Sequence, residues 1–299
     1  MKAVVLARTG GPEELRVEEV PEPEGLVLDV RAAGINFMDV LIRAGRYPQP
    51  PELPAVLGGE VAGELDGRRV MALTRGSGGG YAERVAVDPE WITPLPDGAS
   101  FAEGASFLMT FLTGWIPLKP LVRPESIVLV HAAAGGVGSA AVQLAKHLGA
   151  RVIGTAGSAT KLDAVREVGA DDARTYDELD DVRADLIVDP VGGALFERSL
   201  KLLNPLGAII AIGFAGGVWP QIDPALLVGR NIAVHGFYLG RLMVLRPDVV
   251  RASMDELVQL WVDGALRPVV GAEFPLAEAA EAHRLIESRE SIGKVVLAP

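Results

Sequence analysis

The chain has 299 residues, of which 49% are hydrophobic and 22% are charged. This length and composition fit one or two globular domains. The net charge of −11 disfavours nucleic acid and anionic membranes as general partners. It has no cysteine, which excludes disulfides, thiolate catalysis and sulfur-ligated zinc. With no signal-peptide pattern and no apolar run of the roughly 18 residues that span a membrane, we expect a cytoplasmic protein.

The first part of the chain, to about residue 118, consists of short β-rich runs separated by Gly and Pro. Within 59–73, Asp66-Gly67 separates two such runs and predicts a hairpin, because both residues tolerate positive φ. A helical stretch over 100–118 closes this part. We expect an antiparallel, partly barrel-like domain.

From about residue 124, apolar strands alternate with helices. The runs "SIVLVHA", "RVIGTA" and "ADLIVDPV" are each followed by a helical segment, which predicts a parallel sheet covered on both faces. Two further helices are expected over 248–264 and 276–290. The terminal strand "GKVVLAP" is expected to return to the first domain, because the middle sheet already has its strands.

A glycine cluster, "HAAAGGVG" at 131–138, follows the first of these apolar strands. Gly135 and Gly138 stand at the second and third positions of the dinucleotide fingerprint, with Ala133 at the first. Gly135 would let backbone approach a pyrophosphate, Gly138 would let the next helix pack closely, and Gly136 and Val137 would begin that helix. Such turns also occur without ligands, but this one opens a βαβ unit, which favours cofactor binding.

The tip of the second parallel strand indicates which dinucleotide binds. NAD-binding units usually carry an acid there for the ribose 2′-hydroxyl, whereas this sequence has "GTAGSATK" at 154–161. Gly157, Ser158 and Lys161 would accept a 2′-phosphate that a carboxylate would repel. Lys161 as an ordinary solvated helix residue is the alternative. The tip favours NADPH.

Several motifs in order resemble the zinc-free, zeta-crystallin-like quinone oxidoreductases of the medium-chain dehydrogenase/reductase superfamily. They are "AAGINFMDVLIRAGRYP" at 32–48, "LGGEVAG" at 57–63, "GGGYAERVAV" at 78–87, the glycine cluster, "GTAGSATK", "DPVGG" at 189–193 and the final "GKVVL". The resemblance covers essentially the full chain. The segment 64–70 is shorter than the family's usual spacer, so its substrate selectivity does not carry over.

The resemblance implies an α/β fold with a GroES-like, partly open β-barrel domain and a Rossmann domain with a doubly wound parallel sheet. The expected boundaries are 1–118 for the GroES-like catalytic part and 119–240 for the NADPH-binding domain. Residues 241–299 would form C-terminal helices and the returning strand. A cleft between the domains would hold the substrate.

The resemblance also implies site residues. Asn36 would lie near the nicotinamide and its ribose, and Asp39, in the same motif, would act as an orienting group. Tyr47 would line the quinone pocket and donate a hydrogen bond from its hydroxyl. The implied cofactor contacts include the residues of the glycine turn and of the strand tip. The other implied cofactor contacts are Phe37, Thr110, Tyr176, Gly213, Phe214, Phe237, Tyr238 and Lys294. Of these, Tyr176 belongs to the adenine and 2′-phosphate site, and Lys294 approaches the cofactor phosphates.

Plain structural interpretations stand beside these functional ones. Asn36 and Asp39 could cap a helix, and Tyr47 and Tyr238 could be ordinary partly buried aromatics. Asp189-Pro190 could be a turn at a strand end, and Lys294 could be a solvent-exposed residue at a strand edge.

We expect no metal, because no cysteine is present and the histidines are scattered along the chain at 131, 147, 235 and 283. His131 ends a core strand, which makes it a structural rather than a catalytic candidate.

The motif order and the acid-free strand tip predict an NADPH-dependent quinone oxidoreductase with a small quinone or enone substrate. One alternative is an NADPH-dependent enone or enal double-bond reductase. Another is a non-catalytic NADPH-binding redox sensor. Relatives of this family commonly dimerise through an edge strand, here 231–237, so a homodimer is expected.

Overall fold

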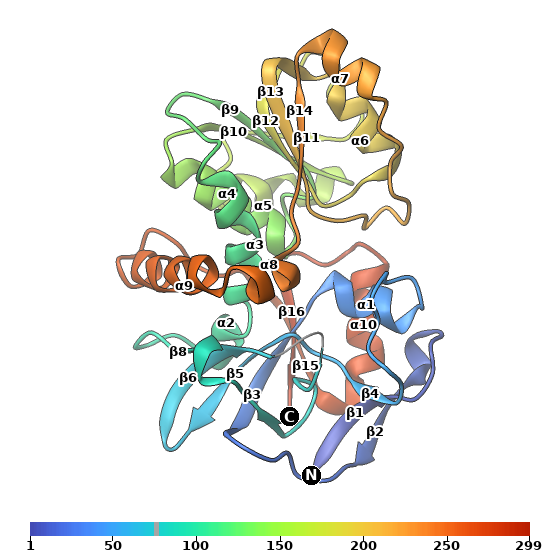
Figure 1. The fold of residues 1–299 in the computed structure, drawn as a ribbon, viewed down its shortest axis with the longest axis vertical. Helices are drawn as coiled ribbons and strands as arrows, with labels where there is room; N and C mark the ends of the chain where they lie inside the picture. Colours follow the sequence, from blue (N-terminus) through green and yellow to red (C-terminus); the bar gives the residue numbers. More distant parts are fainter. Residues whose placement is uncertain (75–77) are drawn as a thin grey trace. The chain divides into compact units, whose positions relative to one another are not determined.

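The computed structural model describes residues 1–74 and 78–299. The chain divides into two compact units (Figure 1). Unit 1 combines Met1–Met109 with Met254–Pro299, and unit 2 is Thr110–Ser253. Within the described ranges, no helix is both long and apolar enough to cross a membrane.

Unit 1 contains two β-sheets. The smaller has the order β2-β1-β4, and the larger runs β15-β16-β3-β5-β6-β8 with β7 paired to β3. The strands are β1 (Lys2–Leu6), β2 (Leu15–Glu19), β3 (Val27–Ile35), β4 (Ala55–Val56), β5 (Glu60–Leu65), β6 (Arg68–Leu73), β7 (Arg84–Ala86), β8 (Ile92–Pro94), β15 (Val270–Pro275) and β16 (Lys294–Ala298). Because β16 pairs antiparallel with β3, the end of the chain lies beside residues 33–35.

The hairpin between β5 and β6 confirms the turn prediction. Asp66 has φ 48° and Gly67 has φ 74°, the two positive values that a tight two-residue turn requires. The flanking residues pair antiparallel from Leu65 with Arg68 to Glu60 with Leu73.

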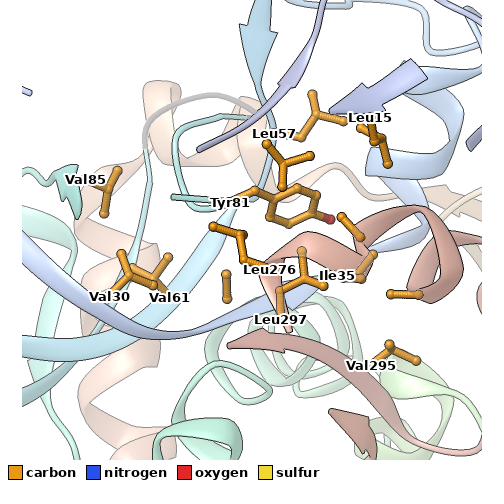
Figure 2. Close-up of a cluster of buried hydrophobic side chains, with 14 of the residues drawn as sticks. Leu15, Val30, Ile35, Leu57, Val61, Tyr81, Val85, Leu276, Val295 and Leu297 are labelled. Atoms are coloured by element: carbon orange, nitrogen blue, oxygen red, sulfur yellow. The ribbon is translucent and has the colours of Figure 1, made fainter. Parts of the chain in front are cut away.

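The core of unit 1 is a cluster of small and branched side chains from both sheets and from the C-terminal segment. Tyr81 is completely buried in it, and Figure 2 shows its ring beside Leu57 and Leu276 with the hydroxyl at the far end. A buried tyrosine hydroxyl needs a hydrogen-bond partner. That partner lies in the candidate site described below.

Short helices complete unit 1. They are α1 (Phe37–Arg43), α2 (Phe101–Gly104) and α10 (Ala279–Glu287). Two longer helices, α3 (Leu108–Leu118) and α9 (Pro247–Val262), lie at the points where the chain passes between the two units. α1 follows β3 directly, so the last residues of β3 and the first turn of α1 form one continuous feature.

Unit 2 is a parallel sheet of six strands in the order β11-β10-β9-β12-β13-β14. Counted along the chain this is the 3-2-1-4-5-6 order of a dinucleotide-binding sheet, so the predicted Rossmann fold is confirmed. The strands are β9 (Ile127–Val130), β10 (Arg151–Ala156), β11 (Asp172–Thr175), β12 (Ala184–Asp189), β13 (Leu203–Ala211) and β14 (Ala233–Gly236).

Helices cover both faces of this sheet (Figure 1). They are α4 (Gly136–His147), α5 (Leu162–Glu167), α6 (Gly193–Leu200) and α7 (Pro224–Arg230), and α8 (Leu239–Leu245) follows the last strand. α4 and α5 pack on β9, β10 and β11, and α6 packs on β13. The central strand β9 is apolar throughout because it is buried on both sides: Val128, Leu129 and Val130 have no exposed surface.

Candidate active site and cofactor-binding edge

A buried polar cluster surrounds the start of α1 in unit 1. Asn36 is the residue before the helix, and its backbone N–H donates to Asp39 Oδ2 at 2.8 Å. The Tyr81 hydroxyl donates to the same oxygen at 3.0 Å. The capping interpretation of Asp39 is therefore confirmed, and its catalytic interpretation stays a prediction.

Burial raises the pKa of Asp39 from 3.8 to about 6, although the hydrogen bonds from Asn36 and Tyr81 and the charge of Lys294 act in the opposite direction. His283 lies behind Tyr81, with Nε2 3.4 Å from the hydroxyl. Burial, helped by Arg43, lowers the pKa of His283 to about 3, so its ring is neutral at physiological pH.

Asp39→Asn is expected to change how stability depends on pH. A carboxyl with a raised pKa binds more protons in the folded than in the unfolded chain, so its contribution is present below about pH 4 and is lost as pH rises through about 6. The Asn36 N–H and the Tyr81 hydroxyl converge on one oxygen, which an amide oxygen can replace. Between pH 4 and 7 the variant should gain about 2 kcal/mol relative to the parent.

Thermal unfolding of the parent and Asp39→Asn across this range checks the prediction, and the exposed Asp97→Asn is the control. His283 is present in both proteins, so its titration cancels in the difference. A pH-independent difference in melting temperature would contradict the assigned pKa.

The side chain of Asn36 lies between two oppositely charged residues. Its Nδ2 donates to Glu60 Oε1 at 3.1 Å, and its Oδ1 accepts from Lys294 Nζ at 2.8 Å. Lys294 Nζ also donates to Glu60 Oε1 at 2.6 Å and to the Ile35 carbonyl at 2.8 Å. The register explains this meeting, because Gly34 pairs with Glu60 and Ile35 pairs with Val295, the neighbour of Lys294.

Gly34 makes the room for Glu60. A Cβ at this position would lie 2.0 Å from the Ala105 carbonyl oxygen and 2.9 Å from Glu60 Cγ. Glycine is therefore required at this position of "AAGIN", because β3 passes close to Ala105 and to Glu60, the first residue of β5. Any larger residue would displace Glu60 from the cluster.

Lys294 is only 5% exposed, so the interpretation that it is a solvent-exposed residue at a strand edge is wrong. Its predicted contact with cofactor phosphates stays a prediction. The cluster also contains Glu60, Tyr81 and His283, which are not among the site residues that the sequence predicts. A signal was present for Glu60: it is a carboxylate inside the otherwise small and apolar "LGGEVAG".

Phe37 and Tyr47 lie at the two ends of α1, and Thr110 lies in α3. Phe37 is the first residue of α1 and is partly exposed. Tyr47 follows the helix, donates its backbone N–H to the Leu41 carbonyl at 3.2 Å, and packs its partly buried ring against the core of unit 1. Thr110 is buried in α3, next to Met109, whose N–H donates to Glu60 Oε2 at 3.0 Å.

In unit 2, the glycine turn joins β9 to α4 at the carboxyl edge of the sheet. A Cβ at Gly138 would lie 2.1 Å from the Ala132 carbonyl oxygen and 2.7 Å from Ala133 Cα. The sequence predicts that this glycine lets the helix pack close to the strand, and the structure shows the close approach at Ala132 and Ala133, directly after β9. Gly135 precedes α4 without a side-chain cap, so the first N–H groups, including those of Gly136 and Val137, point out of the helix end.

The tip of β10 lies beside Tyr176. β10 and β11 run parallel with Ala156 opposite Thr175, and a Cβ on Gly157 would lie 3.7 Å from Tyr176 Cε2. Gly157 and Ser158 are exposed, and the short 3₁₀ helix Ala159–Lys161 follows them. The structure therefore brings together these residues of the predicted 2′-phosphate and adenine site.

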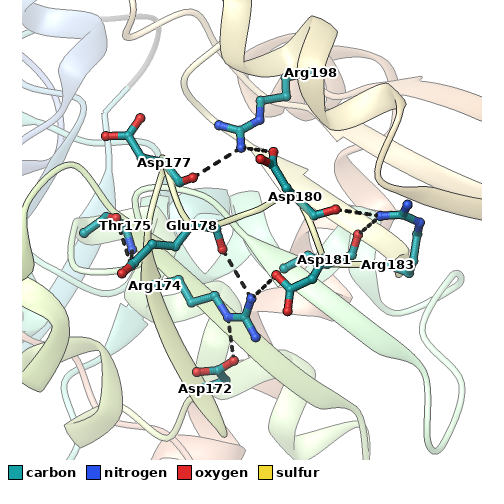
Figure 3. Close-up of polar contacts among 10 residues, drawn as sticks. Asp172, Arg174, Thr175, Asp177, Glu178, Asp180, Asp181, Arg183 and Arg198 are labelled. Atoms are coloured by element: carbon teal, nitrogen blue, oxygen red, sulfur yellow. Dashed lines mark hydrogen bonds and ion pairs between the residues drawn. The ribbon is translucent and has the colours of Figure 1, made fainter.

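The loop that carries Tyr176 is anchored by two arginines (Figure 3). Arg198 donates to the Tyr176 carbonyl and to Asp180 Oδ1, both at 2.6 Å. Arg174 donates to Asp172 Oδ2 at 2.8 Å and to Asp181 Oδ1 at 2.5 Å. These contacts pair carboxylates of an acidic loop next to the place where a phosphate is predicted.

His131 is a structural residue, as predicted. It has no exposed surface, Nδ1 lies 2.8 Å from Thr155 Oγ1, and Nε2 lies 2.7 Å from Ser199 Oγ. Because the Ser199 hydroxyl donates to the Leu195 carbonyl at 2.7 Å, it accepts from Nε2–H. Burial lowers the pKa of His131 to about 3, and the neutral ring ties β9 to β10 and α6.

The remaining predicted residues follow β13 and β14 at the same edge. Gly213 and the buried Phe214 come after β13, and the Phe214 ring packs on Trp219 with centroids 4.3 Å apart. Phe237 follows β14 and donates its N–H to the Ala211 carbonyl at 3.0 Å. Tyr238 is 47% exposed, so about half of its surface is buried. This agrees with the interpretation of Tyr238 as a partly buried aromatic.

Asp189 ends β12 at this edge. Its Oδ1 accepts N–H groups from Val191 at 2.6 Å and from Gly192 at 3.0 Å. The interpretation of Asp189-Pro190 as a turn at a strand end is confirmed. Across residues 1–74 and 78–299, no group of three His, Asp or Glu side chains is arranged to hold a metal ion.

Comparison with known proteins places this arrangement in a family. Residues 22–97 match the alcohol dehydrogenase GroES-like domain, and residues 163–297 match the family described as zinc-binding dehydrogenase. Quinone oxidoreductase-like protein 2 homolog of Nematostella vectensis is 36% identical over 292 residues, which cover 90% of this chain and 80% of that protein.

Two further similarities cover essentially the whole chain. The quinone oxidoreductase of Pseudomonas aeruginosa is 33% identical over 326 residues, covering 100% of this chain and 99% of that one. The quinone oxidoreductase of Thermus thermophilus, whose structure is also known in complex with NADPH, superposes with a TM-score of 0.92 at 42% identity and full coverage of both chains. The chain therefore belongs to the quinone oxidoreductases of the medium-chain dehydrogenase/reductase superfamily, as its motifs predict.

Proposed function

We propose that this protein is an NADPH-dependent quinone oxidoreductase. The observation that carries the proposal is the carboxyl edge of unit 2, where a helix N-terminus follows a glycine turn and an acid-free tip lies beside Tyr176. The N–H groups and the positive helix end suit a pyrophosphate. The tip with Ser158 and Lys161 suits a 2′-phosphate, which a carboxylate would repel. These residues fit NADPH.

The chemistry that NADPH supplies when bound is hydride donation. The chain itself has to hold the reactants in line, exclude water and place hydrogen-bond donors where negative charge develops on the quinone oxygen. We propose that the carboxyl edge of the parallel sheet holds the cofactor and that Asn36 and Tyr47 are the hydrogen-bond donors to the quinone. Asp39 orients the first turn of α1 through the backbone N–H of Asn36.

Steady-state oxidation of NADPH with 1,2-naphthoquinone and with a 2-alkenal tests this function. We expect turnover on the quinone and at least about tenfold lower kcat/KM on the alkenal, a difference of about 1.4 kcal/mol. The reverse order would identify a double-bond reductase. Tight NADPH binding without turnover on either compound would identify a non-catalytic sensor.

We also propose that the protein is a homodimer. β14 is the last strand in the order of the unit 2 sheet as described for residues 1–74 and 78–299, which makes it an edge strand. Leu206 is 89% exposed and its N–H donates to the Asn231 carbonyl, just before β14. Val228 in the preceding helix is 79% exposed. Light scattering after gel filtration should give twice the chain mass, and Val228→Glu should lower it. A cytoplasmic location completes the proposal.

A further inference from the structure

We infer that Glu60 and Lys294 are positioning residues that fix the direction of the Asn36 side-chain amide, so that it presents an N–H donor to the bound reactants. This inference rests on the proposed function, because Asn36 is predicted to face the nicotinamide. It assigns a task to two charged residues that the resemblance does not connect with Asn36.

The chemistry of the two partners allows one amide direction. The lysine ammonium has donors only and lies 2.8 Å from Asn36 Oδ1, and the ionised Glu60 has acceptors only and lies 3.1 Å from Nδ2. Rotating the amide by 180° would set Nδ2 against the ammonium and Oδ1 against the carboxylate. Both contacts would then be repulsive.

The two partners are themselves held in place. Glu60 is 1% exposed, and its second oxygen accepts the Met109 N–H at 3.0 Å. Lys294 is 5% exposed and donates to the Ile35 carbonyl as well as to Glu60. Both Glu60 oxygens and the Lys294 ammonium therefore have protein partners, which define one arrangement of the buried ion pair. The amide of Asn36 is therefore held from one side by fixed groups.

This arrangement determines which atom of the Asn36 amide is left to contact a ligand. Asn36 is partly exposed, whereas Glu60 and Lys294 are buried. The carbonyl oxygen is turned to Lys294 and one Nδ2 hydrogen to Glu60, so the group that remains for a ligand is the second Nδ2 hydrogen. Asn36 consequently serves as a donor toward an oxygen of the reactants, as a developing oxyanion requires.

A double-mutant cycle on kcat separates this positioning from a general structural role. Glu60→Gln keeps the size of the side chain but has a single acceptor oxygen for the three donors Asn36 Nδ2, Lys294 Nζ and Met109 N–H, so the contact that holds the Asn36 amide is weakened. We expect Asn36→Ala to lower kcat for NADPH and a quinone about 100-fold and Glu60→Gln about tenfold. In the Asn36→Ala background, Glu60→Gln should change kcat less than about twofold.

Glu64→Gln is the matched control, because Glu64 lies on the same strand with a 40% exposed side chain. It should leave kcat unchanged. Equal losses from Glu60→Gln in both backgrounds would overturn the inference. Lys294→Met alone leaves a buried carboxylate without its cation, so it is combined with Glu60→Gln, which removes both charges together.

An independent arm of the experiment needs no turnover. The chain has three asparagines, Asn36, Asn204 and Asn231, so labelling asparagine side chains with ¹⁵N gives three amide signals, and Asn36→Ala identifies one. In the Glu60→Gln/Lys294→Met protein we expect this signal to shift and its protons to exchange faster with solvent, while the other two stay in place. An unchanged Asn36 signal in the folded variant would overturn the inference.

The two arms also separate this inference from the proposed function. If the parent protein fails to reduce quinones with NADPH, the proposed function is wrong. The amide signal of Asn36 still decides whether Glu60 and Lys294 hold the side chain.

Discussion

Gly138→Ala is expected to lower the melting temperature by roughly 10 °C and to abolish measurable NADPH binding at micromolar concentrations. The new Cβ would lie 2.1 Å from a backbone oxygen and 2.7 Å from Ala133 Cα. Neither atom belongs to a flexible side-chain end, so α4 or the turn has to move, at a cost of about 3 kcal/mol. Moving α4 also displaces the N–H groups that would bind the pyrophosphate.

Gly135→Ala separates folding from binding at the same turn. Its Cβ would lie 3.3 Å from the Ala132 carbonyl oxygen, and its φ of −87° suits alanine. We expect a melting temperature near that of the parent and NADPH affinity about 10- to 100-fold lower, since the added methyl keeps the phosphate from the backbone.

Gly229→Ala in α7 is the control, because a Cβ there meets no atom within 4 Å. It should leave NADPH binding unchanged and keep the melting temperature at or slightly above that of the parent, because alanine is the better helix former. Differential scanning fluorimetry and the fluorescence of bound NADPH provide the two readouts. A Gly138→Ala protein that melts and binds like the parent would show that the turn is not as tight as described.

Ser158→Asp is expected to reverse the preference for the two nicotinamide cofactors. A carboxylate at the exposed tip of β10 would repel a 2′-phosphate and accept a hydrogen bond from a ribose 2′-hydroxyl. The dissociation constant for NADPH should rise about 100-fold or more, and that for NADH should fall. Titration of both cofactors by fluorescence measures the change.

Lys161→Met tests the cationic half of the same site. Its NADPH affinity should fall about tenfold with little change for NADH, because the ammonium would contact the cofactor at the 2′-phosphate, which NADH lacks. Lys201→Met, an exposed lysine of unit 2, is the charge-matched control. Equal losses for NADPH and NADH in Lys161→Met would show that this lysine acts elsewhere than at the 2′-phosphate.

The features that the sequence predicts well are local ones. Apolar runs bounded by glycine and helical periodicity predict the parallel sheet, because burial on both faces leaves an unbroken apolar strand. Asp66-Gly67 predicts its hairpin from the φ values that the two residues tolerate. The burial of His131 follows from its place at the end of such a strand.

The cluster around Asn36 could be predicted only in part. Asn36 and Asp39 are three residues apart and share a helix start, which the sequence displays. Glu60 and Lys294 reach them through strand pairing over long separations, and that register is not visible in either segment alone. Lys294 therefore looks like a surface residue in the sequence, whereas the pairing of β16 with β3 buries it.

The central claim is that this chain reduces quinones with NADPH held at the acid-free tip of β10. The most direct test is the ratio of kcat/KM for NADPH to that for NADH with 1,2-naphthoquinone as acceptor. We predict turnover with a ratio of about 100 or more, equivalent to about 2.7 kcal/mol. Turnover with a ratio near one, or no turnover with either cofactor, would contradict the account.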